Sequence, residues 1–311
     1  MKTSIIFNPV AGARKQKKLA EAVRVFKAQG ISPIIRETQK RGDAFNFAKE
    51  EVGRGSEIIV AAGGDGTINE VANGLVGTGA RLGILPMGLA NVLAREMSIP
   101  EKPESAVNVI IRGTPQPVNP GYVVLTGSGR EWEMKRYFLL MAGIGFDGGV
   151  MHDINRSHIE RWGKTAYVIA GMRALATYTC RLFTICMDGR KEIDAYSAVV
   201  GKSRYYGGGF MVTPRASLKD EYLDVCAFTD KGAFSMLKQA FAILIGSHPC
   251  KNGAYYEKAR ELKITSEGTV YVQVDGDFLG SLPARLGVHN GALTIMVPAS
   301  TMHANDRYQG N

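Results

Sequence analysis

The stretch from Ile58 to Leu75 constrains the fold of this chain more than any other. It opens with Ile58-Ile59-Val60, an apolar β-branched run typical of a buried strand, and the run ends at the turn Gly63-Gly64-Asp65-Gly66-Thr67. Beyond the turn, apolar residues recur at positions 68, 71, 72 and 75, which is helical spacing. The stretch therefore predicts a strand, a glycine turn and a helix, in that order.

The glycine turn has the features of a phosphate-binding loop. Glycines let the backbone approach a ligand without a Cβ in the way, and the first N–H groups of the following helix have no partner inside the helix. Phosphate suits such a turn. An ordinary tight turn is the alternative, but Asp65, Thr67, Asn69 and Glu70 supply more polar groups than a simple turn needs. The spacing is neither G-x-G-x-x-G nor that of a Walker A loop.

The residues around this stretch predict an α/β domain. Strand and helix patterns alternate along the chain, at 4–7, 15–28, 31–36, 41–52, 58–62, 68–75, 82–85 and 101–112. Such alternation indicates a doubly wound parallel sheet, in which ligands bind at the carboxyl ends of the strands. Four polar or glycine-rich turns fall at those ends: Asn8, Thr38, Gly63 to Thr67 and Pro86 to Asn91.

The pattern changes after Thr114-Pro115-Gln116-Pro117, which is typical of a domain boundary. Short strands separated by turn residues follow, and they indicate a second, mostly antiparallel, sandwich-like domain. We expect an α/β domain at residues 1–116 and a β-sandwich domain at 117–311, with the C-terminal segment free to pack back on the first domain. Apolar stripes at 167–175 and 236–244 predict two helices, which belong either to the core or to a lipid-binding wall.

Length, charge and cysteine content narrow the class of protein. At 311 residues the chain is long for one core, and its formal net charge of +9 favours acidic partners such as nucleotides or an anionic membrane surface. The four cysteines form no C-x-x-C pair, which favours a reduced, cytosolic chain without structural zinc. No window reaches the roughly 18 to 20 apolar residues of a membrane span. Only the net charge favours nucleic-acid binding, because the sequence contains no nucleic-acid recognition motif.

Two acidic motifs lie in the second half of the chain. In the segment from Pro214 to Asp224, Asp220 and Asp224 either hold a hard cation through oxygen ligands or belong to a plain turn. In Asp275-Gly276-Asp277, one carboxylate could act as a general base, whereas Asp-Gly is also a strong hairpin signal. Spacing alone favours the hairpin, and both interpretations hold if the catalytic carboxylate sits on it.

Taken in order, these motifs resemble the catalytic-domain family of diacylglycerol kinases, which includes bacterial soluble lipid kinases, sphingosine kinases and ceramide kinases. The motifs that carry the resemblance are Asn8-Pro9 with Gly12, Gly63 to Leu75, Pro86 to Asn91, Gly143-x-Gly145-x-Asp147, Gly207-Gly208-Gly209, Asp220 to Asp224 and Asp275-Gly276-Asp277. The resemblance covers nearly the whole chain. Gly-Gly-Asp-Gly-Thr alone is shared with NAD kinases and, in variant form, with phosphofructokinases, so the later motifs make the assignment specific.

The resemblance implies an ATP-dependent lipid kinase that uses Mg²⁺ and phosphorylates a hydroxyl of a diacylglycerol-like or sphingoid lipid. It implies Asp277 and Asp275 as catalytic residues, and the Asp220 side chain with the carbonyls of Ser217 and Tyr222 as magnesium ligands. The residues it implies in nucleotide binding are Asn8, Thr38, Gly63, Gly64, Asp65, Gly66, Thr67, Asn69, Gly88 and Asn91.

The expected partners are a lipid substrate at the membrane surface and anionic phospholipid, without nucleic acid, and a homodimer is left open. We expect a cytoplasmic protein and leave peripheral association with a membrane open. A basic exterior would add attraction to an anionic bilayer.

Four residues depart from the family pattern. Leu89 stands where the family commonly has Thr, Val92 where it has Asp, Glu221 where it usually has Gly, and Asp277 where it often has Glu. A non-glycine residue at 221 would cost about 1 kcal/mol if that position needs a positive φ. These departures keep two alternatives open, which are an NAD kinase-like small-molecule kinase and a non-catalytic nucleotide-binding regulator.

Overall fold

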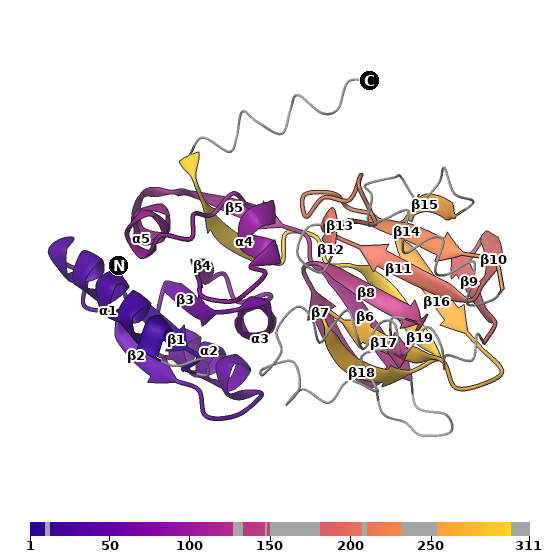
Figure 1. The fold of residues 1–311 in the computed structure, drawn as a ribbon, viewed down its shortest axis with the longest axis horizontal. Coiled ribbons are helices and arrows are strands. Elements are labelled where there is room, and N and C mark those ends of the chain that lie inside the picture. Colours follow the sequence, from indigo (N-terminus) through magenta and orange to yellow (C-terminus); the bar gives the residue numbers. More distant parts are fainter. Residues whose placement is uncertain are drawn as a thin grey trace. The chain divides into compact units, whose positions relative to one another are not determined.

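The computed structural model describes residues 1–9, 13–126, 133–146, 148–149, 181–206, 210–231 and 254–299. The chain divides into two compact units, one formed by Met1–Asn119 with Asn290–Asn311 and the other by Pro120–His289. Each unit has a buried apolar cluster of its own. Figure 1 labels the elements of both units.

The first unit is built on a six-stranded sheet in the order β2-β1-β3-β4-β20-β5. Its strands are β1 (Thr3–Phe7), β2 (Ile34–Glu37), β3 (Ile58–Gly63), β4 (Arg81–Pro86), β5 (Thr114–Val118) and β20 (Leu293–Val297). Neighbouring strands from β2 to β20 run parallel, and β5 pairs with β20 in the antiparallel sense. The parallel sheet predicted from the alternating pattern is confirmed.

Helices cover both faces of this sheet. They are α1 (Ala13–Ala28), α2 (Asp43–Gly53), α3 (Asp65–Leu75), α4 (Val92–Glu96) and α5 (Pro103–Arg112). Helix α1 packs against α5, and α2 packs against α3 (Figure 1). Successive residues of β1 point to opposite faces, so Ile5 and Phe7 join a cluster with Phe26 of α1 and Ile110 of α5, while Ser4 contacts α2.

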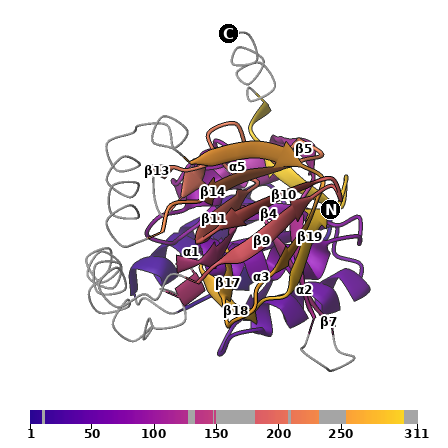
Figure 2. The same cartoon turned by 90° about the vertical axis from the view of Figure 1, so that its right-hand side faces the viewer.

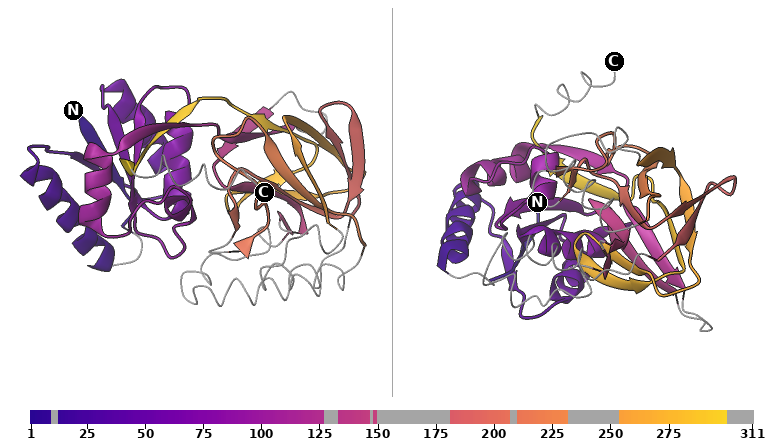
Figure 3. Two further views of the ribbon diagram at one scale, coloured as in Figure 1. Left: turned by 90° about the horizontal axis from the view of Figure 1, so that it is seen from above. Right: turned by 45° about the vertical axis from the view of Figure 1, so that its right-hand side comes forward.

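Strand β20 joins the first sheet after the chain has formed the whole second unit. Ile295 pairs with Leu82 of β4 on one side and with Gln116 of β5 on the other. Figure 3 shows this yellow C-terminal strand among the purple elements. The pattern of residues 293–297 predicts a strand but not its partners, because alternation fits either unit equally well.

The second unit contains two antiparallel six-stranded sheets, in the orders β10-β9-β16-β19-β6-β7 and β15-β14-β11-β8-β17-β18 (Figure 2). The strands of the first are β6 (Gly121–Thr126), β7 (Glu133–Phe138), β9 (Phe183–Met187), β10 (Lys191–Ala195), β16 (Glu261–Thr265) and β19 (Ala284–Val288). Those of the second are β8 (Met141–Gly145), β11 (Ser197–Gly201), β14 (Leu223–Phe228), β15 (Tyr255–Ala259), β17 (Tyr271–Val274) and β18 (Asp277–Ser281). A small pair, β12 (Tyr205–Tyr206) and β13 (Phe210–Met211), stands apart.

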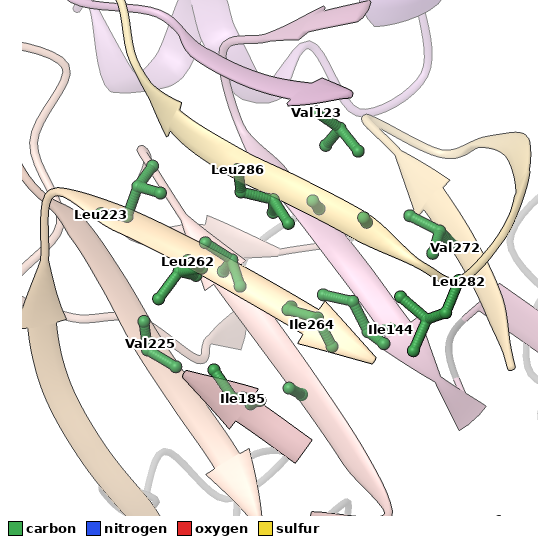
Figure 4. Close-up of a cluster of buried hydrophobic side chains, with 14 of the residues drawn as sticks. Val123, Ile144, Ile185, Leu223, Val225, Leu262, Ile264, Val272, Leu282 and Leu286 are labelled. Atoms are coloured by element: carbon green, nitrogen blue, oxygen red, sulfur yellow. The ribbon is translucent and has the colours of Figure 1, made fainter. Parts of the chain in front are cut away.

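The core of this unit lies between its two sheets. Figure 4 shows Leu262, Ile264 and Leu286 from one sheet beside Ile144 and Val225 from the other. Such side chains alternate with partly exposed ones along β6 and β9, which is the pattern of a sandwich strand. The predicted fold class, a parallel-sheet domain followed by an antiparallel β-sandwich, is confirmed.

Some predicted features fall outside the residues that the structure describes. They are Gly12, Asp147, Gly207 to Gly209, and the apolar helices expected at 167–175 and 236–244. Within the described ranges, the structure contains no helix whose length and apolar character would let it span a bilayer.

Candidate active site

The carboxyl ends of four parallel strands bring together the residues predicted to bind phosphate. Asn8 follows β1, Thr38 follows β2, and the glycine turn joins β3 to α3. The Asn8 side-chain amide donates to Oγ1 of Thr67 at 3.1 Å, and the Thr38 N–H donates to the carbonyl of Phe7 at 2.9 Å. One edge of the sheet therefore carries these polar groups.

Gly64 and Gly88 lie against each other, where the turn after β3 contacts the turn after β4. A Cβ added to Gly88 would lie 2.6 Å from Cα of Gly64, and a Cβ added to Gly64 would lie 3.3 Å from Cα of Gly88. The Met87 N–H also donates to the carbonyl of Gly63 at 2.8 Å. Contact between the two backbones therefore requires glycine at 88 and favours it at 64, whether or not a ligand is present.

Gly66 differs from these glycines because a Cβ at this position would meet nothing within 4 Å. It lies in the first turn of α3. The N-cap residue of this helix is Gly64, which has no side chain that could cap the first N–H groups. The first N–H groups of a helix are suited to bind an anion, and the helix dipole adds to that attraction. The start of α3 therefore combines available donors with open space.

Asp65 and Asn91 shape the neighbouring turn. Oδ1 of Asp65 accepts the N–H of Leu93 at 3.2 Å, which ties the start of α4 to α3. Burial raises the pKa of Asp65, although backbone N–H groups of α4 act in the opposite direction. Asn91 adopts a left-handed conformation, with φ of 48°, and its Oδ1 accepts the N–H of Gly88 at 2.8 Å. Direct nucleotide contacts of these two side chains remain a prediction.

The second acidic motif forms the hairpin between β17 and β18. Asp275 and Gly276 are its two central residues, with φ of 47° and 84°, and Val274 pairs with Asp277. Positive φ at both central positions is the mark of a type I′ turn. The hairpin interpretation is therefore correct for the backbone, and the chemical roles of the two carboxylates depend on their contacts.

Those contacts differ between the two carboxylates. The Asp275 carboxylate accepts three backbone N–H groups, from Leu139, Leu140 and Met141, each at 2.9 Å. It thereby holds the turn between β7 and β8. The Asp277 side chain is 19% exposed, and its Oδ2 lies 4.0 Å from Nη2 of Arg136. Asp277 is therefore the better candidate for a general base, with Asp275 positioning the hairpin.

The oxygens predicted to bind magnesium have hydrogen-bond partners inside the protein. Nζ of Lys202 donates to the predicted Tyr222 carbonyl at 3.0 Å, and at 2.6 Å to the Asp220 carbonyl, which is not among the predicted ligands. Nζ of Lys258 donates to Oδ2 of Asp220 at 2.5 Å, and the Ser217 carbonyl accepts the N–H of Asp220 at 3.1 Å. With both ammonium groups in place, this set of oxygens does not fit a divalent ion.

The burial of Lys202 could not be predicted from the sequence, because a lysine that follows an apolar strand carries no periodic signal that its ammonium is buried. The described residues also contain no group of three or more His, Cys, Asp or Glu side chains arranged to hold a metal ion.

The two parts of the chain match two family models. Residues 2–123 match the Diacylglycerol kinase catalytic domain, and residues 141–297 match the YegS C-terminal NAD kinase beta sandwich-like domain. A diacylglycerol kinase of Bacillus subtilis is 31% identical over 286 residues, which cover 90% of each chain. The chain belongs to the diacylglycerol kinase family. A diacylglycerol kinase of Mycobacterium tuberculosis is 28% identical over 303 residues, which cover 96% of this chain and 95% of the relative.

Solved structures share the fold of this diacylglycerol kinase family member. A diacylglycerol kinase from Bacillus anthracis superposes with a TM-score of 0.74 at 24% identity, covering 96% of this chain and 98% of that one. Yeast NADH kinase complexed with NADH superposes with a TM-score of 0.55 at 8% identity, covering 100% and 89%. The family makes the chain a kinase with an alcohol group as acceptor, as predicted, and supports a lipid as that acceptor.

The structure shows the exposure and contacts of three residues at which this kinase departs from the family pattern. Leu89 is 77% exposed, and Val92 is buried in the first turn of α4. Glu221 is exposed, pairs with Arg260 at 3.2 Å, and does not have a positive φ. The condition for strain at position 221 is therefore not met, because such strain exists only in the left-handed region.

We expect Gly66→Ala to separate nucleotide binding from folding. Alanine in a helix is favoured over glycine by about 0.5 to 1 kcal/mol, so the variant should unfold at the same or a slightly higher temperature. Its methyl group would occupy the space over the first turn of α3, and ATP affinity measured by calorimetry should fall at least tenfold. Gly53→Ala is the matched control, because its Cβ also meets nothing within 4 Å and it ends α2 away from this turn. Unchanged ATP affinity in a folded Gly66→Ala protein would show that the phosphates do not bind at the start of α3.

Proposed function

We propose that this chain transfers the γ-phosphate of ATP to a hydroxyl of a diacylglycerol-like or sphingoid lipid. The observation that carries the proposal is the uncapped start of α3, which lies at the carboxyl ends of parallel strands in a member of the diacylglycerol kinase family. The N–H groups there suit the phosphates of a nucleotide. ATP is the expected donor, taken up as its magnesium complex.

For each task of phosphoryl transfer, the chain offers a candidate residue. The reaction needs the phosphates held and the acceptor hydroxyl positioned, with little covalent chemistry from the protein. In this proposal Gly66 and Thr67 offer backbone N–H groups to the phosphates, with Asn8 and Thr38 beside them. Asp277 takes the proton from the lipid hydroxyl, and Asp275 holds the hairpin that carries it.

One experiment tests the proposal directly. The purified protein is incubated with radiolabelled ATP and extracted membrane lipids, and any labelled product is identified. A labelled lipid phosphate is the expected result. Parallel reactions with NAD test the small-molecule alternative, for which NADP would be the product. ATP binding without a labelled lipid or NADP would instead favour a non-catalytic regulator and contradict the proposal.

Attachment to the membrane is expected to depend on charge. The chain carries a formal net charge of +9, and Arg14 and Lys17 are exposed on α1. Sedimentation with anionic phospholipid vesicles should fall steeply as salt rises, because surface charges are screened within about 10 Å at 0.1 M salt. Vesicles of neutral phosphatidylcholine are the control and should sediment little protein. Binding that is insensitive to salt would contradict attachment by charge.

A further inference from the structure

Lys202 is a buried lysine that the proposed reaction does not use. It follows β11, its side chain is 0% exposed, and its backbone N–H donates to the carbonyl of Leu140 at 2.8 Å. Its Nζ donates to the carbonyl oxygens of Asp220 and Tyr222. A buried ammonium without partners would be very costly, so these two bonds account for its position.

The charges around Lys202 balance. Two ammonium groups, those of Lys202 and Lys258, face two carboxylates, those of Asp220 and Asp224. Asp224 is fully buried, and its Oδ1 accepts the hydroxyl proton of Tyr256 at 2.7 Å. A divalent ion added to this cluster would bring two uncompensated positive charges into a partly buried site, which is unfavourable where the dielectric constant is below that of water.

Two main-chain carbonyls beside one carboxylate are also the oxygen donors that Mg²⁺ and Ca²⁺ take in proteins. Such an ion needs these oxygens at about 2.0 to 2.6 Å. The ligands expected here are the Ser217 and Tyr222 carbonyls and the Asp220 side chain. Nζ of Lys202 lies 3.0 Å from the Tyr222 carbonyl and 2.6 Å from the neighbouring Asp220 carbonyl, and Nζ of Lys258 holds Oδ2 of Asp220. The two ammonium groups and a metal ion therefore compete for the Tyr222 carbonyl and the Asp220 carboxylate.

We propose that the Lys202 ammonium is a built-in cation that takes the place of a divalent metal ion in the segment from Ser217 to Tyr222. The ammonium fixes the turn that leads into β14, and the segment keeps its shape without metal. This role stands whether or not the chain phosphorylates a lipid.

The first test uses the unmodified protein without nucleotide. Thermal unfolding is measured in EDTA and in millimolar Mg²⁺, Ca²⁺ and Mn²⁺, and metal binding is measured by calorimetry. We expect the same unfolding temperature in all four solutions. Saturable metal binding that Asp220→Asn abolishes would overturn the proposal, whereas binding that Asp220→Asn leaves unchanged lies elsewhere and supports it.

The second test removes the ammonium. Lys202→Asn should unfold at a lower temperature in EDTA and should regain stability in Ca²⁺ or Mg²⁺, with metal affinity at least tenfold tighter than that of the unmodified protein. Lys258→Met is the matched control, because it removes an ammonium from Asp220 and leaves Lys202 on both carbonyls. It should not respond to metal.

Two results for the variant would contradict the proposal. One is Lys202→Asn unfolding at the original temperature in EDTA, and the other is a loss of stability that no metal ion restores. If Lys202→Asn folds in none of the solutions, the titration of the unmodified protein decides, because that measurement requires no substitution.

Discussion

Replacing Asp277 by Asn is expected to lower turnover by about 10² to 10⁴, the range that a positioned general base contributes. Asn keeps the shape and volume of Asp but cannot take the proton from the lipid hydroxyl. The Asp277 side chain is partly exposed at the start of β18, so the unfolding temperature should change little. Nucleotide affinity should also survive, because in our proposal the phosphates bind the first unit. Single-turnover phosphorylation, thermal unfolding and ATP titration measure the three quantities.

Asp275→Asn is the matched control on the same hairpin. An amide in place of the Asp275 carboxylate would turn its NH₂ group toward one of the three backbone N–H donors at residues 139–141. Leaving a buried donor without its acceptor costs about 1 to 3 kcal/mol. This variant should therefore lose stability, whereas Asp277→Asn should lose turnover. If both variants phosphorylate lipid at the original rate, the pair is only a hairpin turn and the base lies elsewhere.

Glu51→Gln is expected to destabilise the first unit by about 2 to 4 kcal/mol, or about 5 to 15 °C in unfolding temperature. The Glu51 side chain is fully buried on α2 and binds three residues at once, one on β1, one on β2 and one just after α2. Its carboxylate accepts the hydroxyl proton of Ser4 at 2.9 Å and guanidinium N–H groups of Arg36 at 2.9 Å and Arg54 at 2.6 Å. Glutamine carries no charge, so both guanidinium groups lose their anionic acceptor in a buried site.

Glu50→Gln is the control for Glu51, because Glu50 is its neighbour on α2 and pairs with the same Arg36 at 2.9 Å. The Glu50 side chain is exposed, and an exposed ion pair contributes only about 0 to 1 kcal/mol. Its substitution should therefore change the unfolding temperature little. Equal losses in the two variants would show that burial of Glu51 does not matter.

The pH dependence of stability gives a second measurement on Glu51. Burial acts to raise its pKa, but the bonds from Ser4, Arg36 and Arg54 outweigh burial and hold the pKa below the ordinary value of 4.5. The contribution of Glu51 is therefore complete above pH 4.5 and is lost as the pH falls through the lower, folded-state pKa. Unfolding temperatures measured from pH 6 to pH 3 should decline less steeply in Glu51→Gln than in the unmodified protein. Identical slopes would contradict this assignment.

Local sequence patterns predicted most elements of the first unit. The β-branched run at Ile58 gives β3, and the helical spacing that ends at Leu75 gives α3. The Asp275-Gly276 pair gives a hairpin turn. These features depend on backbone preferences and on the alternation of apolar residues, which act between neighbours in the chain. The order of motifs along the chain also indicated the kinase family that the comparisons show.

Only the tertiary structure decided how distant residues meet. Strand β20 fits either sheet by its pattern, and its pairing with β4 and β5 depends on contacts across more than a hundred residues. The backbone contact of Gly64 with Gly88, the three donors on Asp275 and the Lys202 ammonium on two carbonyls likewise join residues from different elements. Side-chain type and spacing report burial along one element, whereas hydrogen-bond partners are set by packing between elements. The sequence by itself therefore determined the fold class and the candidate residues, and the tertiary structure decided which hydrogen-bond partners those residues have.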